Sequence, residues 1–98
     1  MKIITTQDAI NAVCNTFDVK EAELLSSETK NHNIKLRRQM LIYLLREKLK
    51  HGLQEIGDLL NMTSSGVHVA LGLYYSKLAD ENSRAALEFR TLMQILED

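Results

Sequence analysis

The stretch "LQEIGDLLNMTSSGVHVAL", residues 53–71, decides the fold of this chain. Its apolar residues recur three and four positions apart on both sides of a short polar segment, which predicts two helices joined by a tight turn. Gly57, Asn61 and Val67 stand where a helix-turn-helix needs a small residue, a turn residue and a β-branched residue that wedges the two helices together. Other tight helical hairpins use similar residues, so the spacing indicates a helix-turn-helix but does not by itself establish DNA binding.

The composition of the whole chain agrees with a helical protein. Its 98 residues include no proline and only four glycines, while strong helix formers dominate and 45% of the residues are hydrophobic. Long helices are therefore favoured, and little in the chain would form hairpin turns. We predict an all-α fold, a compact bundle of five to six helices in a single domain over residues 1–98, with the helix-turn-helix at about 53–78.

Local signals place the individual helices. Thr5 and Asp8 form a capping-box pattern, Asp18 is expected to cap a short helix, Gly52 to stop a long one, and Thr63 to cap the helix that follows the turn. Asn61 suits a turn because asparagine tolerates positive φ. The expected helices cover roughly residues 6–17, a short segment after 18, 34–50, 53–60, about 64–78 and most of 83–98.

Several function classes have little support in the sequence. Cys14 is the only cysteine, so no internal disulfide can form, and a buried structural thiol in a reducing compartment is expected. His32, His51 and His68 lack metal-ligand spacing, and no group is placed to activate Cys14 as a nucleophile. We therefore expect no enzyme activity, no catalytic residues, no metal, no cofactor and no small-molecule substrate.

The hydropathy of the chain bears on its location. No apolar run approaches the roughly 18 residues of a membrane span, and the N-terminus lacks the regions of a secretion signal. The expectation is a cytoplasmic protein without a membrane partner.

Charge is distributed unevenly along the chain. The formal net charge is −1, yet residues 28–55 carry seven basic and three acidic side chains, and the segments on both sides are net negative. An anion would therefore meet the central third of the sequence. Lys35, Arg37 and Arg38, at the start of the third helix, are predicted to hold DNA phosphates, although they could instead be solvated on the outer face of that helix.

The helix after Asn61 supplies the remaining candidates for DNA binding. Backbone amides at its start could bind a phosphate, and its polar side chains could contact bases. These candidate residues are Thr63, Ser64, Ser65, His68 and Val69. Because no basic residue precedes Lys77 on this helix, the strongest base-contacting side chains are missing. Val69 and Leu73 could equally contact a second subunit, so a homodimer is also possible.

The stretch "LRRQMLIYLLREKLKHGLQEIGDLL" resembles the C-terminal DNA-binding domain of the bacterial replication initiator DnaA, a Trp-repressor-like helix-turn-helix. That family has the pattern R-Q-x-A-M-x-L-x-R-E-L-T followed by S-L-x-x-I-G-x-x-F. The matching positions are Arg38, Gln39, Leu44, Arg46, Glu47, Leu53, Glu55, Ile56, Gly57 and Asp58. The segments "AINAVCNTFDVKEAELLSS" and "LEFRTLMQIL" resemble the entry and closing helices of the family, so the resemblance covers nearly the whole chain.

The sequence departs from the family at two places. The base-reading signature G-G-R-D-H-[ST]-T-V is replaced by "NMTSSGV", and Leu36 stands where the basic loop of the family has an arginine, while Arg38 is kept. The resemblance thus implies the family fold with a different or weaker target preference. The ATPase part of the initiator is absent from this sequence, so we do not expect an initiator.

Two hypotheses follow from these observations. The first is a small helix-turn-helix protein that binds duplex DNA and regulates transcription or replication in a bacterium. The alternative is a protein-interaction module that keeps the fold but has lost specific DNA binding. It would bind itself or a partner through the uncharged surface around Val69, Gly72, Leu73 and Tyr75.

Overall fold

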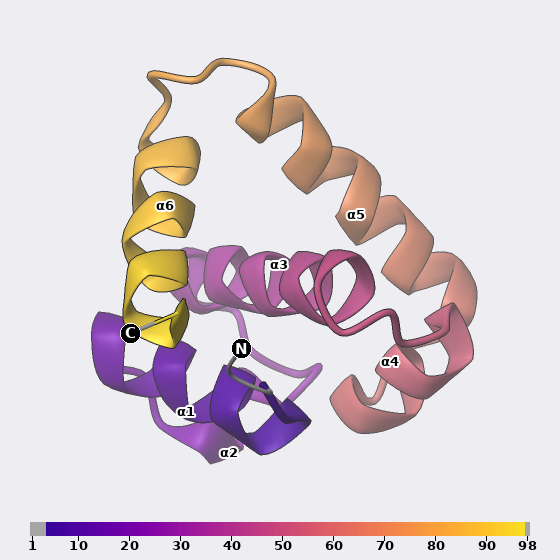
Figure 1. Cartoon of the computed structure of the whole chain (residues 1–98). Helices are drawn as coiled ribbons and strands as arrows, with labels where there is room; N and C mark the ends of the chain where they lie inside the picture. Colours follow the sequence, from indigo (N-terminus) through magenta and orange to yellow (C-terminus); the bar gives the residue numbers. More distant parts are fainter. Residues whose placement is uncertain (1–3, 98) are drawn as a thin grey trace.

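The computed structural model describes residues 4–97, and every regular element in this range is a helix (Figure 1). The six helices are α1 (Thr6–Phe17), α2 (Glu21–Leu24), α3 (His32–Glu47), α4 (Leu53–Leu60), α5 (Ser64–Leu78) and α6 (Arg84–Glu97). The all-α prediction is confirmed.

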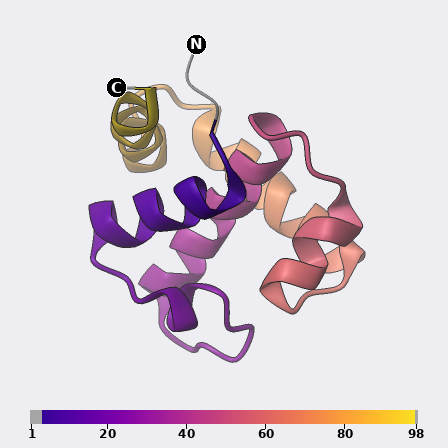
Figure 2. The same cartoon turned by 60° about the horizontal axis from the view of Figure 1, so that its bottom comes forward.

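Helix α3 lies at the centre of the molecule. It contacts α1 and α2 on one side and α4 and α5 on the other, while α6 packs against α1 and α5 (Figure 1). Figure 2 shows α1 in front of α3 and places α4 on the opposite side of the molecule from α6. The chain therefore wraps its other helices around the most apolar stretch of α3, which includes Met40, Leu41, Ile42, Leu44 and Leu45.

The core is built mainly from aliphatic side chains. Each fully buried residue of this kind stabilises the fold by about 1.5–3 kcal/mol relative to an exposed position. Members of the core from the other helices include Ile10, Val13, Leu24, Ile56, Leu60, Val67, Leu71, Leu92 and Leu96. All six helices thus contribute to one cluster, as the predicted bundle requires.

Capping interactions set several helix boundaries at the predicted residues. The Thr5 hydroxyl accepts from the Asp8 amide, and the Asp8 carboxylate accepts from the Thr5 amide, so the predicted capping box begins α1. Thr63 caps α5, because its Oγ1 accepts from the Gly66 amide at 3.0 Å. Asn61 ends α4 with φ 57° and ψ 47°, the left-handed conformation that asparagine tolerates.

Two capping predictions are wrong. Asp18 does not begin α2. It ends α1 in the left-handed conformation, and Lys20 precedes α2. Gly52 does not stop the third helix, because α3 ends at Glu47 and the residue with positive φ is Lys50. Gly52 begins α4, where its amide donates to Glu55 Oε1 at 3.1 Å.

Cys14 was predicted to be a buried thiol, but it is only half-buried. Burial and the nearby carboxylate of Glu21 raise the pKa of its thiol, which therefore stays protonated. None of the helices in residues 4–97 combines the length and the apolar character that crossing a membrane would need.

Candidate nucleic-acid interface

Helices α4 and α5 form a closely packed hairpin around Gly57. The Met62 amide donates to the Gly57 carbonyl at 2.8 Å. A Cβ atom on residue 57 would lie only 2.5 Å from the Met62 carbonyl oxygen, a distance that backbone atoms cannot accommodate. Gly57 is therefore the small residue that the hairpin needs, and Val67 is fully buried between the helices as the motif predicts.

Helix α5 buries one stripe and leaves the opposite face open. Val67, Ala70, Leu71 and Tyr74 pack against α3, α4 and α6. The open face includes Ser65, His68, Val69, Gly72 and Leu73. No Lys, Arg, Asp or Glu occurs between Asp58 and Lys77. With His68 neutral, the helix thus presents an uncharged outer surface.

The five α5 candidates surround the beginning of this open face. Thr63, Ser65, His68 and Val69 are exposed, and Ser64 is partly exposed. The Thr63 oxygen already accepts the capping hydrogen bond, so its hydroxyl proton remains available to an outside acceptor. The structure therefore brings all five together on one accessible surface.

Lys35 is the one exposed member of the three predicted phosphate-binding cations. It borders a surface hollow of about 240 Å³, which Met62 and Ala70 line from the helix-turn-helix and Thr29 lines from the loop before α3. Lys35 is thus placed beside one edge of α5.

Arg38 points into the protein and is only 6% exposed. Its guanidinium donates to the Leu24 carbonyl at 2.8 Å and to the Leu60 carbonyl at 2.9 Å. These residues are the last of α2 and α4, where carbonyls lack partners within the helix and a positive charge is favoured. The prediction that Arg38 lies free for phosphates is therefore corrected: its donors join two helix ends.

Arg37 is likewise turned inward and is 8% exposed. Its guanidinium forms an ion pair with Glu88 of α6 at 2.8 Å and lies 3.9 Å from the centre of the Phe17 ring. This contact holds the pKa of Glu88 below its ordinary value. The expectation of a phosphate contact is corrected here too, because Arg37 joins α3 to α1 and α6.

Arg46 is the cation that sequence reasoning left out of the site. It is exposed on α3 and borders a second hollow of about 250 Å³, together with His68, Gly72 and Tyr75 of α5. One signal could have identified it: Lys35 and Arg46 are eleven residues apart, about three helical turns, and so share a face of α3. Ile42, buried between them on that face, completes the pattern.

A family model described as the bacterial DnaA protein helix-turn-helix matches residues 6–71. The chain belongs to this family. The match runs from the start of α1 to the middle of α5, so it covers both helices around the turn as well as central α3. No curated protein matches the chain.

The DnaA helix-turn-helix fold is therefore kept, while the residues at the start of α5 differ from the base-reading signature of the family. In this DnaA helix-turn-helix domain Thr63, Ser64 and Ser65 occupy that position. The second half of α5 and all of α6 lie outside the matched residues. Within residues 4–97, no cluster of His, Cys, Asp or Glu is arranged to hold a metal ion.

Proposed function

We propose that this domain binds duplex DNA by inserting the start of α5 into the major groove, and that it acts as a regulator of transcription or replication in the bacterial cytoplasm. The observation that carries the proposal is the open face of α5 between two exposed cations, Lys35 at one edge and Arg46 at the other. Membership of the DnaA helix-turn-helix family supports it.

The separation of the two cations suits a groove. Eleven residues of α-helix correspond to roughly 16 Å along the axis. The major groove of B-DNA is about 12 Å wide and admits one α-helix, with a phosphate backbone on each side. With α5 in the groove, Lys35 and Arg46 would each approach one backbone.

The start of α5 offers a limited set of contacts to the bases and phosphates. The free amides of its first turn can donate to a phosphate, and the hydroxyl of Ser65 can donate or accept. His68 can also donate or accept, and Val69, 61% exposed, can pack against a thymine methyl group. Without a bidentate arginine contact to guanine, we expect modest sequence preference.

The charge distribution supports binding that depends strongly on salt. Because each neutralised phosphate releases counterions, the logarithm of the binding constant falls with the logarithm of salt concentration, with a slope of about −0.9 per phosphate. Two to four phosphate contacts therefore predict a slope of about −2 to −4.

Fluorescence anisotropy with a labelled random duplex tests this proposal. Lys35→Ala and Arg46→Ala should each weaken binding to every sequence and reduce the salt slope by about one. Arg90→Ala is the matched control, since Arg90 is exposed on α6 and should leave binding unchanged. Absence of binding at low ionic strength, or equal effects of all three substitutions, would contradict the proposal.

The exposed apolar side chains of α5 favour a second candidate function, association with a protein. Val69 and Leu73 are 61% and 51% exposed, and both lie on the uncharged face. Such a surface could pair with a second copy of the chain. Light scattering over a range of protein concentrations distinguishes the two functions. A dimer that the substitution Leu73→Asp dissociates supports association. A protein that stays monomeric at every concentration rules out the homodimer.

A further inference from the structure

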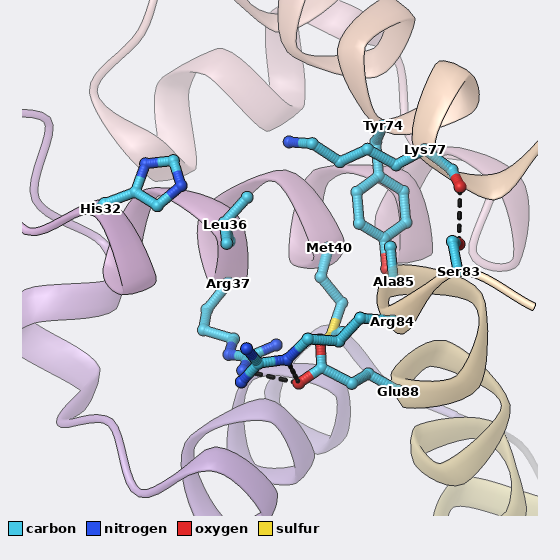
Figure 3. Close-up of a pocket in the computed structure, with 10 residues that line it drawn as sticks. All are labelled: His32, Leu36, Arg37, Met40, Tyr74, Lys77, Ser83, Arg84, Ala85 and Glu88. Carbon is cyan, nitrogen blue, oxygen red and sulfur yellow. Dashed lines mark hydrogen bonds and ion pairs between the residues drawn. The ribbon is translucent and has the colours of Figure 1, made fainter.

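A cavity of about 300 Å³ lies between α3, α5 and α6, away from the start of α5 (Figure 3). This volume is at the lower end of the range for pockets that hold small molecules. Leu36, Met40 and Ala85 give it an apolar lining. Its wall includes residues of α6, which lies outside the family match.

The wall of the cavity includes a buried hydrogen-bonding group without a partner among the described residues, the hydroxyl of Tyr74. Tyr74 is 2% exposed, and its hydroxyl has no hydrogen-bond partner in the described part of the chain. Figure 3 shows its ring directed from α5 toward Ala85 on α6. Ring contacts with Tyr43 at 5.3 Å and Phe89 at 6.3 Å between centroids hold the ring in place. A buried hydroxyl normally has a partner, and no protein group in residues 4–97 accepts from this one, so it is left to donate to an acceptor from outside the chain.

The charge around the cavity indicates the kind of acceptor. The cavity is lined by three cations and one carboxylate, namely Arg37, Lys77, Arg84 and Glu88. The formal net charge of the lining is therefore +2 with His32 counted as neutral, which favours an anionic acceptor. Arg37 is held by Glu88, and Lys77 donates to Gln39 at 2.6 Å.

Arg84 is the cation best able to turn toward a bound anion. Its side chain is 83% exposed, and its Nε lies 3.6 Å from the Glu88 carboxylate. Burial and the charge of Glu88 keep the pKa of Tyr74 high, so the hydroxyl is a donor.

We propose that this cavity binds a small organic carboxylate with an apolar body. The body packs against Leu36, Met40 and Ala85, while the carboxylate accepts from the Tyr74 hydroxyl and is attracted by Arg84. The site is separate from the proposed DNA-binding surface and does not depend on it.

Titration of the protein with phenylacetate and isocaproate, observed by the methyl NMR signals of Met40 and Ala85, tests the proposal. Both acids should shift these signals in a saturable way. Phenylacetamide, which has the same shape but no charge, should bind at least about tenfold more weakly, because hydrogen bonds to charged groups are the stronger ones. Equal affinity for the acid and the amide, or no shift with either acid, would overturn the proposal.

Two variants separate ligand binding from a structural role. Tyr74→Phe should weaken phenylacetate binding about fivefold, the effect of losing one hydrogen bond, while leaving the free protein at least as stable. Arg84→Gln should weaken binding by a similar factor, whereas Arg90→Gln, the matched control on the same helix, should not. Affinity unchanged in both Tyr74→Phe and Arg84→Gln would refute the assignment.

Discussion

Replacing Arg38 with methionine should destabilise the fold without removing a DNA contact. Arg38 satisfies the carbonyls of Leu24 and Leu60 at the ends of α2 and α4. A buried carbonyl that loses its donor costs about 1–3 kcal/mol, so two cost roughly 2–6 kcal/mol. Methionine avoids the burial of a charge, which offsets part of that loss. We expect the free energy of unfolding to fall by about 3 kcal/mol.

Urea denaturation followed by circular dichroism measures this change. The urea concentration at the midpoint of unfolding should fall, with little change in the slope of the free energy of unfolding against urea concentration. The melting temperature should drop by about 12–24 °C for a domain of this size. Arg90→Met, at an exposed position on α6, should change the free energy of unfolding by less than about 0.5 kcal/mol.

Duplex binding by the same variant completes the test. At a temperature where Arg38→Met remains folded, its affinity for DNA should lie within about twofold of wild type, since the side chain is not placed to meet phosphates. A variant as stable as wild type that binds DNA tenfold more weakly would refute the assignment of Arg38 to the helix ends.

Other predictions concern the hairpin of α4 and α5 and the ion pair between Arg37 of α3 and Glu88 of α6. Gly57→Ala should destabilise the fold by about 2 kcal/mol, because the new Cβ would clash with the Met62 carbonyl. Gly72→Ala should stabilise the fold by about 0.5–1 kcal/mol, because a Cβ on residue 72 would meet open space. Thermal melts of the two variants measure both changes. Asn61→Ala should cost about 1 kcal/mol for its left-handed backbone, as measured by urea denaturation, and Asn61→Gly should not. The lowered pKa of Glu88 means that its stabilising contribution is present above its ordinary value of 4.5 and is lost as the pH falls through the folded value. Glu88→Gln should therefore reduce the loss of stability in acid, and a melting series from about pH 6 to pH 3 that matches wild type would contradict this.

Helix boundaries could be predicted from the sequence where the interaction that sets them joins residues close together in the chain. The capping box of Thr5 and Asp8, the Thr63 cap and the turn at Asn61 each depend on residues within four positions of one another. These signals predicted the start of α1, the end of α4 and the start of α5. The end of α3 was misplaced because Lys50, a residue that rarely adopts positive φ, takes the conformation expected of the nearby glycine.

The direction in which the side chains of Arg37 and Arg38 point could not be predicted from the number of charged residues in that part of the sequence. Arg37 and Arg38 belong to the most basic part of the sequence, but their partners are as far away as Glu88 and Leu60. Helical spacing carried a partial signal, because Arg38 shares a face of α3 with Ile34 and Leu41, which are buried. The same spacing places Lys35 with Arg46, and the packing of α5 across that face makes the pair a candidate for phosphate binding.

The central claim, that DNA approaches the start of α5, is tested most directly by backbone amide NMR of the labelled protein during titration with a duplex at low salt. We predict the largest shifts at Ser64, Ser65 and Val69, with Leu92 and Leu96 of α6 unaffected. Shifts confined to α1 and α6, or none at all, would contradict the account.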